Sequence, residues 1–211
     1  MTKLKIKAKA ITELLLKTYP EASCTLDFEN PFELLVATRL SAQCTDKRVN
    51  IVCGDLFIKY KSIADFAAAD IFELENVIKP CGFYHTKAKS IIETANILID
   101  KFGGEIPKDM DSLLTLSGVG RKSANLILGE LYGYNGIVVD THCIRLCNRL
   151  GLVEVKDPFK IEKALQELID GDKTMHFCHS LVLHGRQVCS ARKPLCDGCV
   201  LEELCSRRGV G

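Results

Sequence analysis

Hydrophobic residues recur along this chain at intervals of three and four positions, which is the spacing of α-helices with one buried face. Convincing alternation of apolar and polar positions, as in β-strands, is absent, and the short apolar stretch 137–139 is predicted to be a buried connector. The pattern therefore predicts an all-α fold. The predicted helices are residues 4–18, a helix from Pro31, a helix capped by Thr45 or Asp46, and residues 70–78, 84–102, 109–115, 120–131, 141–150, 158–169 and 175–187.

The chain has 211 residues, of which 47% are hydrophobic, enough for one large core or two closely packed lobes. No apolar run reaches the length that spans a bilayer, and the amino terminus, which alternates lysine with apolar residues, lacks the apolar core of a signal peptide. Eleven cysteines without an export signal indicate a reducing compartment. We expect an intracellular protein without a membrane partner, cytoplasmic if the source is prokaryotic.

The net charge of +1 does not mark the chain as a nucleic-acid-binding protein, but basic residues gather in two places. One is the amino-terminal segment, and the other surrounds a group of cysteines near the carboxyl end. These basic residues are Lys3, Lys5, Lys7, Lys9, Lys17, Arg186, Arg192, Lys193, Arg207 and Arg208. Such blocks are more often solvated helix faces than binding sites, so charge alone indicates DNA binding only weakly.

Four cysteines lie close together near the end of the chain. Cys189, Cys196, Cys199 and Cys205 are separated by six, two and five residues, with no histidine between them. Thiolates so near in sequence can converge on one soft metal centre. Structural zinc usually has two separated C-x-x-C pairs or a mixed Cys/His set, whereas only one C-x-x-C occurs here. The spacing therefore favours a [4Fe–4S] cluster over zinc.

Residues 113–127 predict a tight turn between two helices. Gly118-Val119-Gly120 would form the turn, with Val119 filling the core. Glycine allows positive φ and lets backbone N–H groups approach a phosphate closely, and the next helix points its positive end at the same place. Such a turn binds a DNA backbone whatever the base sequence. An ordinary glycine-containing turn is the alternative, although the apolar residues that frame the turn favour DNA binding.

Two ionisable residues near this turn are candidates for chemistry. Lys122 lies in the first turn of the predicted helix, where the helix dipole disfavours a cation. The same field, together with partial burial, would keep some of its amine neutral and nucleophilic, although a phosphate contact explains Lys122 equally well. Asp140 follows the connector 137–139 and could simply cap the next helix. Capping is compatible with catalysis, because a capped carboxylate has a fixed orientation.

Three motifs together resemble the endonuclease III family, which belongs to the helix-hairpin-helix, Gly/Pro-Asp superfamily of DNA glycosylases. They are Leu-Ser-Gly-Val-Gly-Arg-Lys-Ser-Ala-Asn at 116–125, Val-Asp-Thr-His at 139–142, and the four spaced cysteines. Residues 40–46 and 183–186 resemble further segments of the family, so the match covers most of the chain. One departure is Ser117, where the family commonly has proline, and a slightly less rigid turn is expected there.

The resemblance implies a two-lobed helical fold. A six-helix barrel would span residues 24–134 and contain the helix-hairpin-helix at about 110–129. Residues 1–23 would join 135–211 in a second lobe, which holds a [4Fe–4S] cluster in a loop at 189–205. This cluster is expected to be structural, because base excision transfers no electrons. We also expect the protein to act as a monomer without a nucleotide cofactor.

The resemblance further implies a bifunctional glycosylase and lyase of base excision repair that excises oxidised pyrimidines from damaged double-stranded DNA. Lys122 would attack C1′ of a flipped-out nucleotide and form a Schiff base, while Asp140 stabilises positive charge on the sugar. β-Elimination would then cut the strand 3′ to the abasic site. Relatives that only remove the base generally lack a lysine at this position.

DNA-contacting residues are also implied by motif position. Gln43 would fill the space left by the flipped nucleotide, and Phe83 would insert beside it on the opposite strand. Separately, the loop between Cys189 and Cys196 would be held at both ends by iron ligands and would present Arg192 and Lys193 to phosphates, with an ordinary solvated loop as the alternative. The implied DNA-contacting residues are Gln43, Phe83, Gly118, Gly120, Arg121, His142, Arg192 and Lys193.

Two other functions remain open from the sequence. An adenine-specific mismatch glycosylase would share the fold and cluster, but that branch usually has a further carboxyl-terminal domain. A non-catalytic iron–sulfur DNA-binding module would not need both Lys122 and Asp140. Cys143 and Cys147 share a helix face near His142, yet buried thiols are a commoner explanation of that spacing than a metal site.

Overall fold

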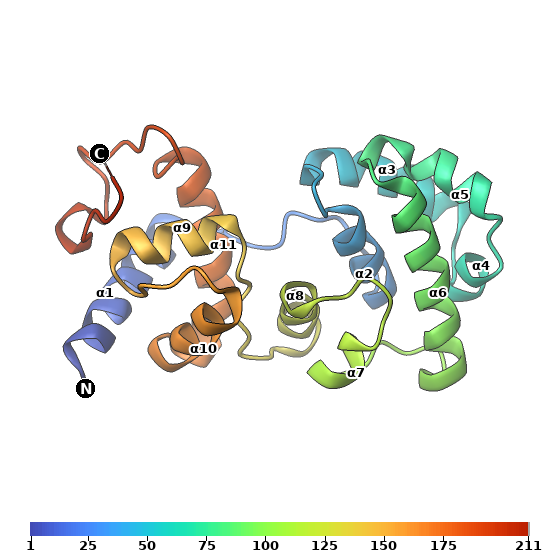
Figure 1. The fold of residues 1–211 in the computed structure, drawn as a ribbon, viewed down its shortest axis with the longest axis horizontal. Helices are drawn as coiled ribbons and strands as arrows, with labels where there is room; N and C mark the ends of the chain where they lie inside the picture. The colour runs from blue at the N-terminus through green and yellow to red at the C-terminus, as the bar shows by residue number, and fades with distance from the viewer. Residues whose placement is uncertain (211) are drawn as a thin grey trace. The chain divides into compact units, whose positions relative to one another are not determined.

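The computed structural model describes residues 1–210, and in that range the chain folds into α-helices joined by loops and short 3₁₀ helices, with no strand (Figure 1). The predicted all-α fold is confirmed. Contacts between helices divide the chain into two units, Thr25–Tyr132 and a unit that combines Met1–Cys24 with the chain from Gly133 onward. The boundaries implied by the family resemblance are 24–134, and 1–23 with 135–211.

The internal unit, Thr25–Tyr132, is one continuous stretch of chain. The long helix α6 packs against α4 and α5, and α8 packs against α2 and α7. Phe66 lies in the core of this unit, with its ring 5.2 Å from that of Phe32 and 5.0 Å from that of Tyr60. Its elements are α2 (Pro31–Leu40), α3 (Asp46–Lys59), α4 (Ile63–Ala67), α5 (Ile71–Ile78), η1 (Lys79–Cys81), α6 (Tyr84–Phe102), α7 (Met110–Leu114) and α8 (Arg121–Tyr132).

The other unit joins the two ends of the described chain. In Figure 1 the blue amino-terminal helix α1 lies with the orange helices α10 and α11, and α1 packs against both of them. Its core contains buried residues from every one of its α-helices, such as Ile11, Leu146, Leu165 and Leu181. The elements are α1 (Lys3–Thr18), α9 (Thr141–Leu150), α10 (Pro158–Leu168), η2 (Gly171–Lys173), α11 (Thr174–Gln187) and η3 (Glu202–Leu204).

Most helices begin where the sequence places a capping side chain. The side chain of Asn30 accepts a hydrogen bond from the backbone N–H of Glu33 at 3.0 Å and begins α2. Thr45, and not Asp46, is the residue that caps α3. Helices α6 and α9 have the bounds predicted from periodicity, and the predicted connector is confirmed, because Ile137 is fully buried outside any helix.

Helix α4 is absent from the sequence-based prediction. It has only five residues, too few for an apolar period to be visible. Its signal is a capping box, in which Ser62 and Asp65 each accept a hydrogen bond from the other's backbone N–H. The spacing Ser-x-x-Asp at 62–65 would have located this helix.

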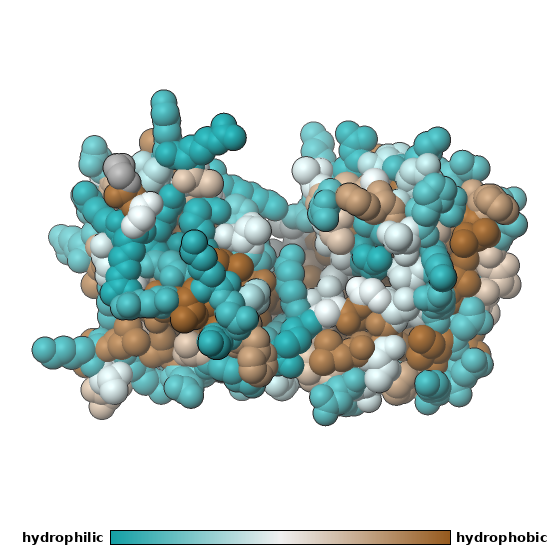
Figure 2. Space-filling view, in the orientation of Figure 1, coloured by the Kyte–Doolittle hydropathy of each residue, from teal (hydrophilic) through white to brown (hydrophobic). Residues whose placement is uncertain are grey.

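The surface in view carries mostly hydrophilic residues with apolar patches between them, as expected for a chain whose apolar residues fill interior cores (Figure 2). Within residues 1–210, no helix is both long enough and apolar enough to cross a bilayer.

Candidate nucleic-acid interface and metal centre

The turn between α7 and α8 contains a glycine that the structure requires. Gly118 has φ +75°, a conformation that side chains disfavour, and a Cβ at this position would collide with the guanidinium end of Arg39. The Nε atom of Arg39 donates a hydrogen bond to Ser90 Oγ at 2.6 Å, so the arginine is held beneath the turn. The turn therefore places a bare backbone segment against a positive side chain.

Ser117 connects the same turn to helix α6. Its hydroxyl donates to Glu93 Oε2 at 2.6 Å, and its carbonyl accepts from Thr94 Oγ1 at 3.2 Å. Proline, which the resembled family commonly has here, would lack the hydroxyl of the first bond. The serine thus has a compensating attachment that proline could not make.

Two expectations about this turn are wrong. Val119 is half-buried and does not fill the core; Leu116, which is 2% exposed, lies inside instead. Lys122 is exposed, so partial burial does not act on its amine. Its place in the first turn of α8 is as predicted. Arg121, half-buried, is the first residue of the same helix.

Asp140 caps helix α9, as predicted. Its Oδ1 atom accepts a hydrogen bond from the backbone N–H of Cys143 at 2.7 Å, and the side chain is half-buried. His142, in the first turn of α9, has Nδ1 3.1 Å from Arg145 Nη2, and its ring lies where a Cβ on Gly185 would be. Both side chains are therefore fixed in orientation by their own unit.

Gln43 and Phe83 lie in two turns of the internal unit. Both are exposed, Phe83 by 63%, and both have positive φ, +54° and +48°. Positive φ is uncommon for residues with a side chain and indicates a backbone held by its surroundings. An exposed aromatic ring on such a rigid turn suits insertion between bases.

The four cysteines predicted to hold a metal line one pocket. Apolar residues such as Leu146, Leu150 and Leu201 also line it, together with Arg149, His184, Glu202 and Arg207. N–H groups point at the sulfurs: Arg149 Nη1 lies 3.2 Å from Cys189 Sγ, and the backbone N–H groups of Leu201 and Arg207 lie within 3.5 Å of Cys199 and Cys205. Hydrogen bonds to sulfur within an apolar shell are the surroundings that an iron–sulfur cluster requires, so these residues fit one.

A site for a single metal ion differs from a cluster site, because its ligands must converge on one point. Among residues 1–210, no group of three or more His, Cys, Asp or Glu side chains is placed to hold one metal ion. The fit of a cluster accordingly rests on the shared pocket, the four sulfurs and their N–H donors.

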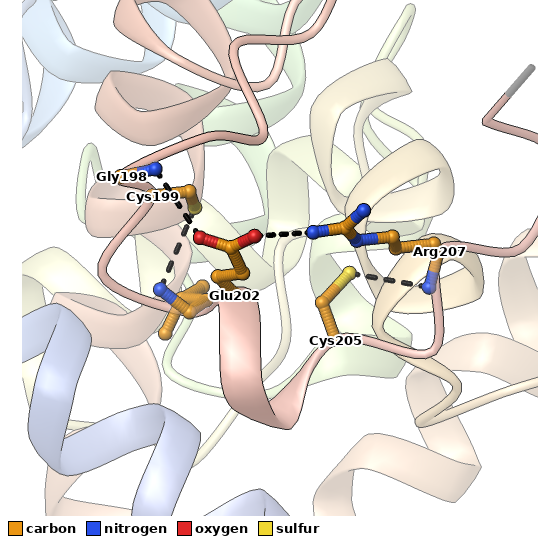
Figure 3. Close-up of polar contacts among 6 residues, drawn as sticks. Gly198, Cys199, Glu202, Cys205 and Arg207 are labelled. Carbon is orange, nitrogen blue, oxygen red and sulfur yellow. Dashed lines mark hydrogen bonds and ion pairs between the residues drawn. The ribbon is translucent and has the colours of Figure 1, made fainter.

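Glu202 holds the cysteine-rich segment together (Figure 3). One carboxylate oxygen accepts from the backbone N–H of Gly198 at 3.2 Å, and the other accepts from the guanidinium of Arg207. Because Gly198 precedes Cys199 and Arg207 follows Cys205 by two positions, the carboxylate spans the segment that contains these two ligands.

Arg149 and Arg145 hold the other end of the cysteine segment, and sequence reasoning missed both. Arg149 is 7% exposed and donates to the carbonyls of Ser190 and Ala191 at 2.7 and 2.8 Å. Arg145 donates to the carbonyl of Cys189 at 3.0 Å. The available signal was two arginines four positions apart, and therefore on one face, in a helix that is otherwise largely buried.

The basic residues of this loop are exposed beside well-held backbone. Lys193 and Arg192 face solvent, while Ser190 Oγ donates to the carbonyl of Lys193 at 2.6 Å. Hydrogen bonds from Ser190 and Arg149 therefore hold the backbone of this loop.

Cys143 and Cys147 are buried thiols, as expected, and His184 has a structural role beside the cysteine segment. Cys143 and Cys147 are buried with their sulfurs 4.0 Å apart, and hydrogen bonding to Cys147 together with burial raises the pKa of the Cys143 thiol. His184 is 2% exposed and lies between Tyr19 Oη, at 3.0 Å, and Cys199 Sγ, at 3.5 Å. His184 thus packs beside the predicted cluster ligands.

Comparison with protein families identifies two regions. Residues 36–170 match the model of the HhH-GPD superfamily of base excision DNA repair proteins, and residues 189–205 match the iron–sulfur binding domain of endonuclease III. The second match contains all four predicted cluster ligands.

Curated proteins and solved structures agree over nearly the full length. Endonuclease III of Synechocystis is 46% identical over 97% of this chain and 95% of its own, and that of Escherichia coli is 38% identical over 95% of each. A structure described as a non-covalent endonuclease III–DNA complex superposes with a TM-score of 0.92 at 40% identity, covering 98% of this chain and 97% of that one. A trapped endonuclease III–DNA covalent intermediate gives the same values.

Proposed function

The chain belongs to the endonuclease III family of the HhH-GPD superfamily, and we propose that Lys122 and Asp140 perform its chemistry. It is a bifunctional DNA glycosylase and AP lyase of base excision repair that contains a [4Fe–4S] cluster. We further propose that the substrates are oxidised pyrimidines in duplex DNA.

The observation that supports Lys122 as the nucleophile is its position. Its exposed side chain leaves the first turn of α8, directly after the Gly118 turn. The bare backbone of that turn and the positive end of α8 would bind a phosphate of the DNA, and this contact would bring a neighbouring deoxyribose to the amine. A flexible lysine beside a fixed phosphate site can then reach C1′ of an extruded nucleotide.

The covalent step is a displacement at C1′. The lone pair of the Lys122 amine forms a bond to C1′, the bond from C1′ to the base nitrogen breaks, and the base leaves with that electron pair and takes up a proton. Opening of the sugar ring gives a Schiff base. Loss of a proton from C2′ then expels the 3′ phosphate, and water hydrolyses the imine, which regenerates Lys122.

Asp140 would supply negative charge for this reaction. Because its Oδ1 atom is fixed by the N–H of Cys143, the carboxylate keeps one orientation. A fixed anion stabilises positive charge that develops on the sugar without reorganising, and it can accept a proton from the attacking amine.

The proposed DNA contacts divide into two groups. Gly118, Gly120, Arg121, Arg192 and Lys193 would bind phosphates, which fixes the position of the protein without reading the sequence. Gln43 and Phe83 would enter the base stack and replace the contacts of the extruded nucleotide. His142, two positions after Asp140, would also contact the DNA. Support comes from the relatives whose solved structures are described as complexes with DNA.

Cys189, Cys196, Cys199 and Cys205 are the residues that would ligate the cluster. The cluster, when bound, supplies bonds from iron to all four sulfurs and thereby cross-links residues 189–205. Arg149 and Glu202 hold the same segment from either end, so that Arg192 and Lys193 meet phosphates at low entropic cost. We propose that the protein acts as a monomer without a nucleotide cofactor.

Borohydride trapping tests the nucleophile. Reduction of the Schiff base should link the wild-type protein covalently to DNA that contains an abasic site, and Lys122→Gln should give no linked product while retaining affinity for DNA. Lys101→Gln, an exposed lysine on α6, is the control and should be trapped as the wild type is. Trapping of Lys122→Gln at the wild-type yield would remove Lys122 from this role.

A panel of lesions tests the substrate class. Duplexes that contain thymine glycol, a plain abasic site or an A·G mismatch would be incubated with the protein. Release of thymine glycol together with cutting at the abasic site is expected. Release of adenine from the mismatch, with thymine glycol left intact, would contradict the assignment to oxidised pyrimidines.

A further inference from the structure

Lys87 is a buried cation that the proposed chemistry does not use. Its side chain leaves the first turn of α6, the residue is 1% exposed, and burial lowers its pKa. The ammonium donates to three backbone carbonyls, those of Leu40 and Ala42 at 2.8 Å and that of Cys81 at 2.9 Å. An ammonium has three donors, so each has an acceptor, and the cost of burying the charge is offset by these bonds.

The three carbonyls belong to the two turns that contain Gln43 and Phe83. Leu40 is the last residue of α2 and Ala42 directly precedes Gln43, whereas Cys81 ends η1 two positions before Phe83. Carbonyls at a helix carboxyl end lack partners within the helix and form its negative pole, which suits a cation. One ammonium therefore joins two turns that are far apart in sequence.

These turns contain two of the three residues other than glycine with positive φ in the described chain, Gln43 at +54° and Phe83 at +48°. Such conformations persist where neighbouring contacts fix the backbone. The contacts of Lys87 lie just before each of these residues, and its own backbone N–H donates to the carbonyl of Phe83 at 3.0 Å. The ammonium of Lys87 thus holds the backbone just before the strained Phe83, and the first backbone hydrogen bond of α6 holds the carbonyl of Phe83 itself.

We propose that Lys87 is a positioning residue, whose ammonium holds Gln43 and Phe83 together in the arrangement that enters duplex DNA. The inference rests on the proposed function, in which these two side chains insert into the base stack. Two side chains that are fixed beforehand insert with less loss of conformational entropy than two loose turns would. Lys87 should therefore matter where a duplex must be opened, and not where the deoxyribose is already accessible.

Lys87→Met tests this by removing the charge and the three donors while keeping the length of the side chain. Single-turnover excision of thymine glycol from a paired duplex should slow by about tenfold or more, because small misplacements in an active site cost that much. Borohydride trapping on a single-stranded oligonucleotide with an abasic site should stay at the wild-type rate. Lys101→Met, which changes an exposed lysine of the same helix, should leave both rates unchanged.

A double-mutant comparison separates this inference from the proposed function. In the Gln43→Ala/Phe83→Ala background, which should itself be slow on duplex, Lys87→Met should cause no further loss. If Lys87→Met slows this background by the same factor as it slows the wild type, Lys87 does not act through the two side chains. The inference about Lys87 then fails, while the proposed function stands. If the Gln43→Ala/Phe83→Ala protein cuts duplex at the wild-type rate, the proposed insertion is wrong.

A general structural role predicts a different result. Lys87→Met would then slow duplex excision and single-strand trapping by the same factor, which would overturn the inference. Lys87→Gln, which keeps a shorter amide donor, should fold more readily and lie between the wild type and Lys87→Met on duplex substrate. If neither variant folds, Lys87 is required for folding and the positioning role is rejected.

Discussion

The carboxylate of Asp140 begins helix α9 by accepting a hydrogen bond from the backbone N–H of Cys143. The same group is the proposed source of negative charge beside the reacting sugar. A capping bond needs only an acceptor oxygen, whereas stabilisation of a cation needs the charge. The two roles can therefore be separated by a substitution that keeps the oxygen and removes the charge.

Asp140→Asn makes that change. Asparagine caps helices as well as aspartate, so the melting temperature should stay close to that of the wild type. Excision of thymine glycol should fall by about 10²-fold or more, the usual size of a lost catalytic carboxylate. Single-turnover kinetics and thermal melting measure the two effects.

Asp157→Asn is the matched control for this substitution, because Asp157 caps α10 through the N–H of Lys160 at 2.9 Å and has no proposed role in the reaction. It should leave excision unchanged. Equal rates for Asp140→Asn and the wild type would mean that Asp140 is a helix cap alone.

At the scale of helices and turns, the short helix α4 depends on its capping box. Hydrogen bonds from Ser62 and from the backbone N–H of Lys61 hold the pKa of Asp65 below its ordinary value of 3.8. A carboxyl whose pKa is lowered in the folded state stabilises the fold at a pH above its ordinary pKa. This contribution is lost as the pH falls through the lowered pKa. The box therefore supports α4 at neutral pH and weakens in acid.

Ser62→Ala should raise the pKa of Asp65 toward 3.8, because the hydroxyl is the largest cause of the shift. NMR titration of the Asp65 carboxyl measures this directly. Ser23→Ala, whose hydroxyl is bonded to the carbonyl of Glu21, should leave the titration as it is. An unchanged Asp65 curve in Ser62→Ala would show that the backbone donors alone set the pKa.

Elements with a long apolar period could be predicted from the sequence, and short or polar features could not. The bounds of α6 and α9 followed from periodicity because each buries one face, whereas α4 is too short to have a period. Val119 and Lys122 were placed too deep, since the order of residues in a turn does not determine which side chain faces inward.

In the candidate site, too, local features could be predicted from the sequence and tertiary contacts could not. The cysteine spacing and the capping position of Asp140 are local, so the sequence contains them. Lys87 and Arg149 act on carbonyls far away in the chain, and each looks like an ordinary surface residue until the fold brings Leu40 or Ser190 to it. Contacts of this kind depend on tertiary structure and leave no trace in local periodicity.

At the scale of the whole molecule, the unit that contains the cysteine segment is held by contacts between its two ends. Lys7 Nζ on α1 donates to Ser206 Oγ at 2.8 Å, and Ser206 in turn donates to the carbonyl of Leu150 at 3.2 Å. The cysteine segment therefore links α1 with α9. Neither of these two hydrogen bonds involves a residue of the internal unit, Thr25–Tyr132.

Removal of the cluster should consequently act on one unit. Oxidative loss of iron should increase amide hydrogen exchange in residues 188–206 and in α1, while the helices of Thr25–Tyr132 keep their protection. Exchange read by mass spectrometry, beside loss of the visible absorbance, measures this. A uniform rise in exchange along the chain would contradict independent behaviour of the units.

The union of both ends in one unit also determines the order in which the chain can fold during its synthesis. Translation completes the continuous stretch Thr25–Tyr132 early, and domains generally fold as units when they emerge from the ribosome. Helix α1 precedes this stretch in the chain, whereas its partners α10 and α11 follow it. Its apolar residues Ile11 and Leu15 therefore stay uncovered by α10 and α11 until translation has passed Thr25–Tyr132, and until then they are exposed apolar surface on the nascent chain.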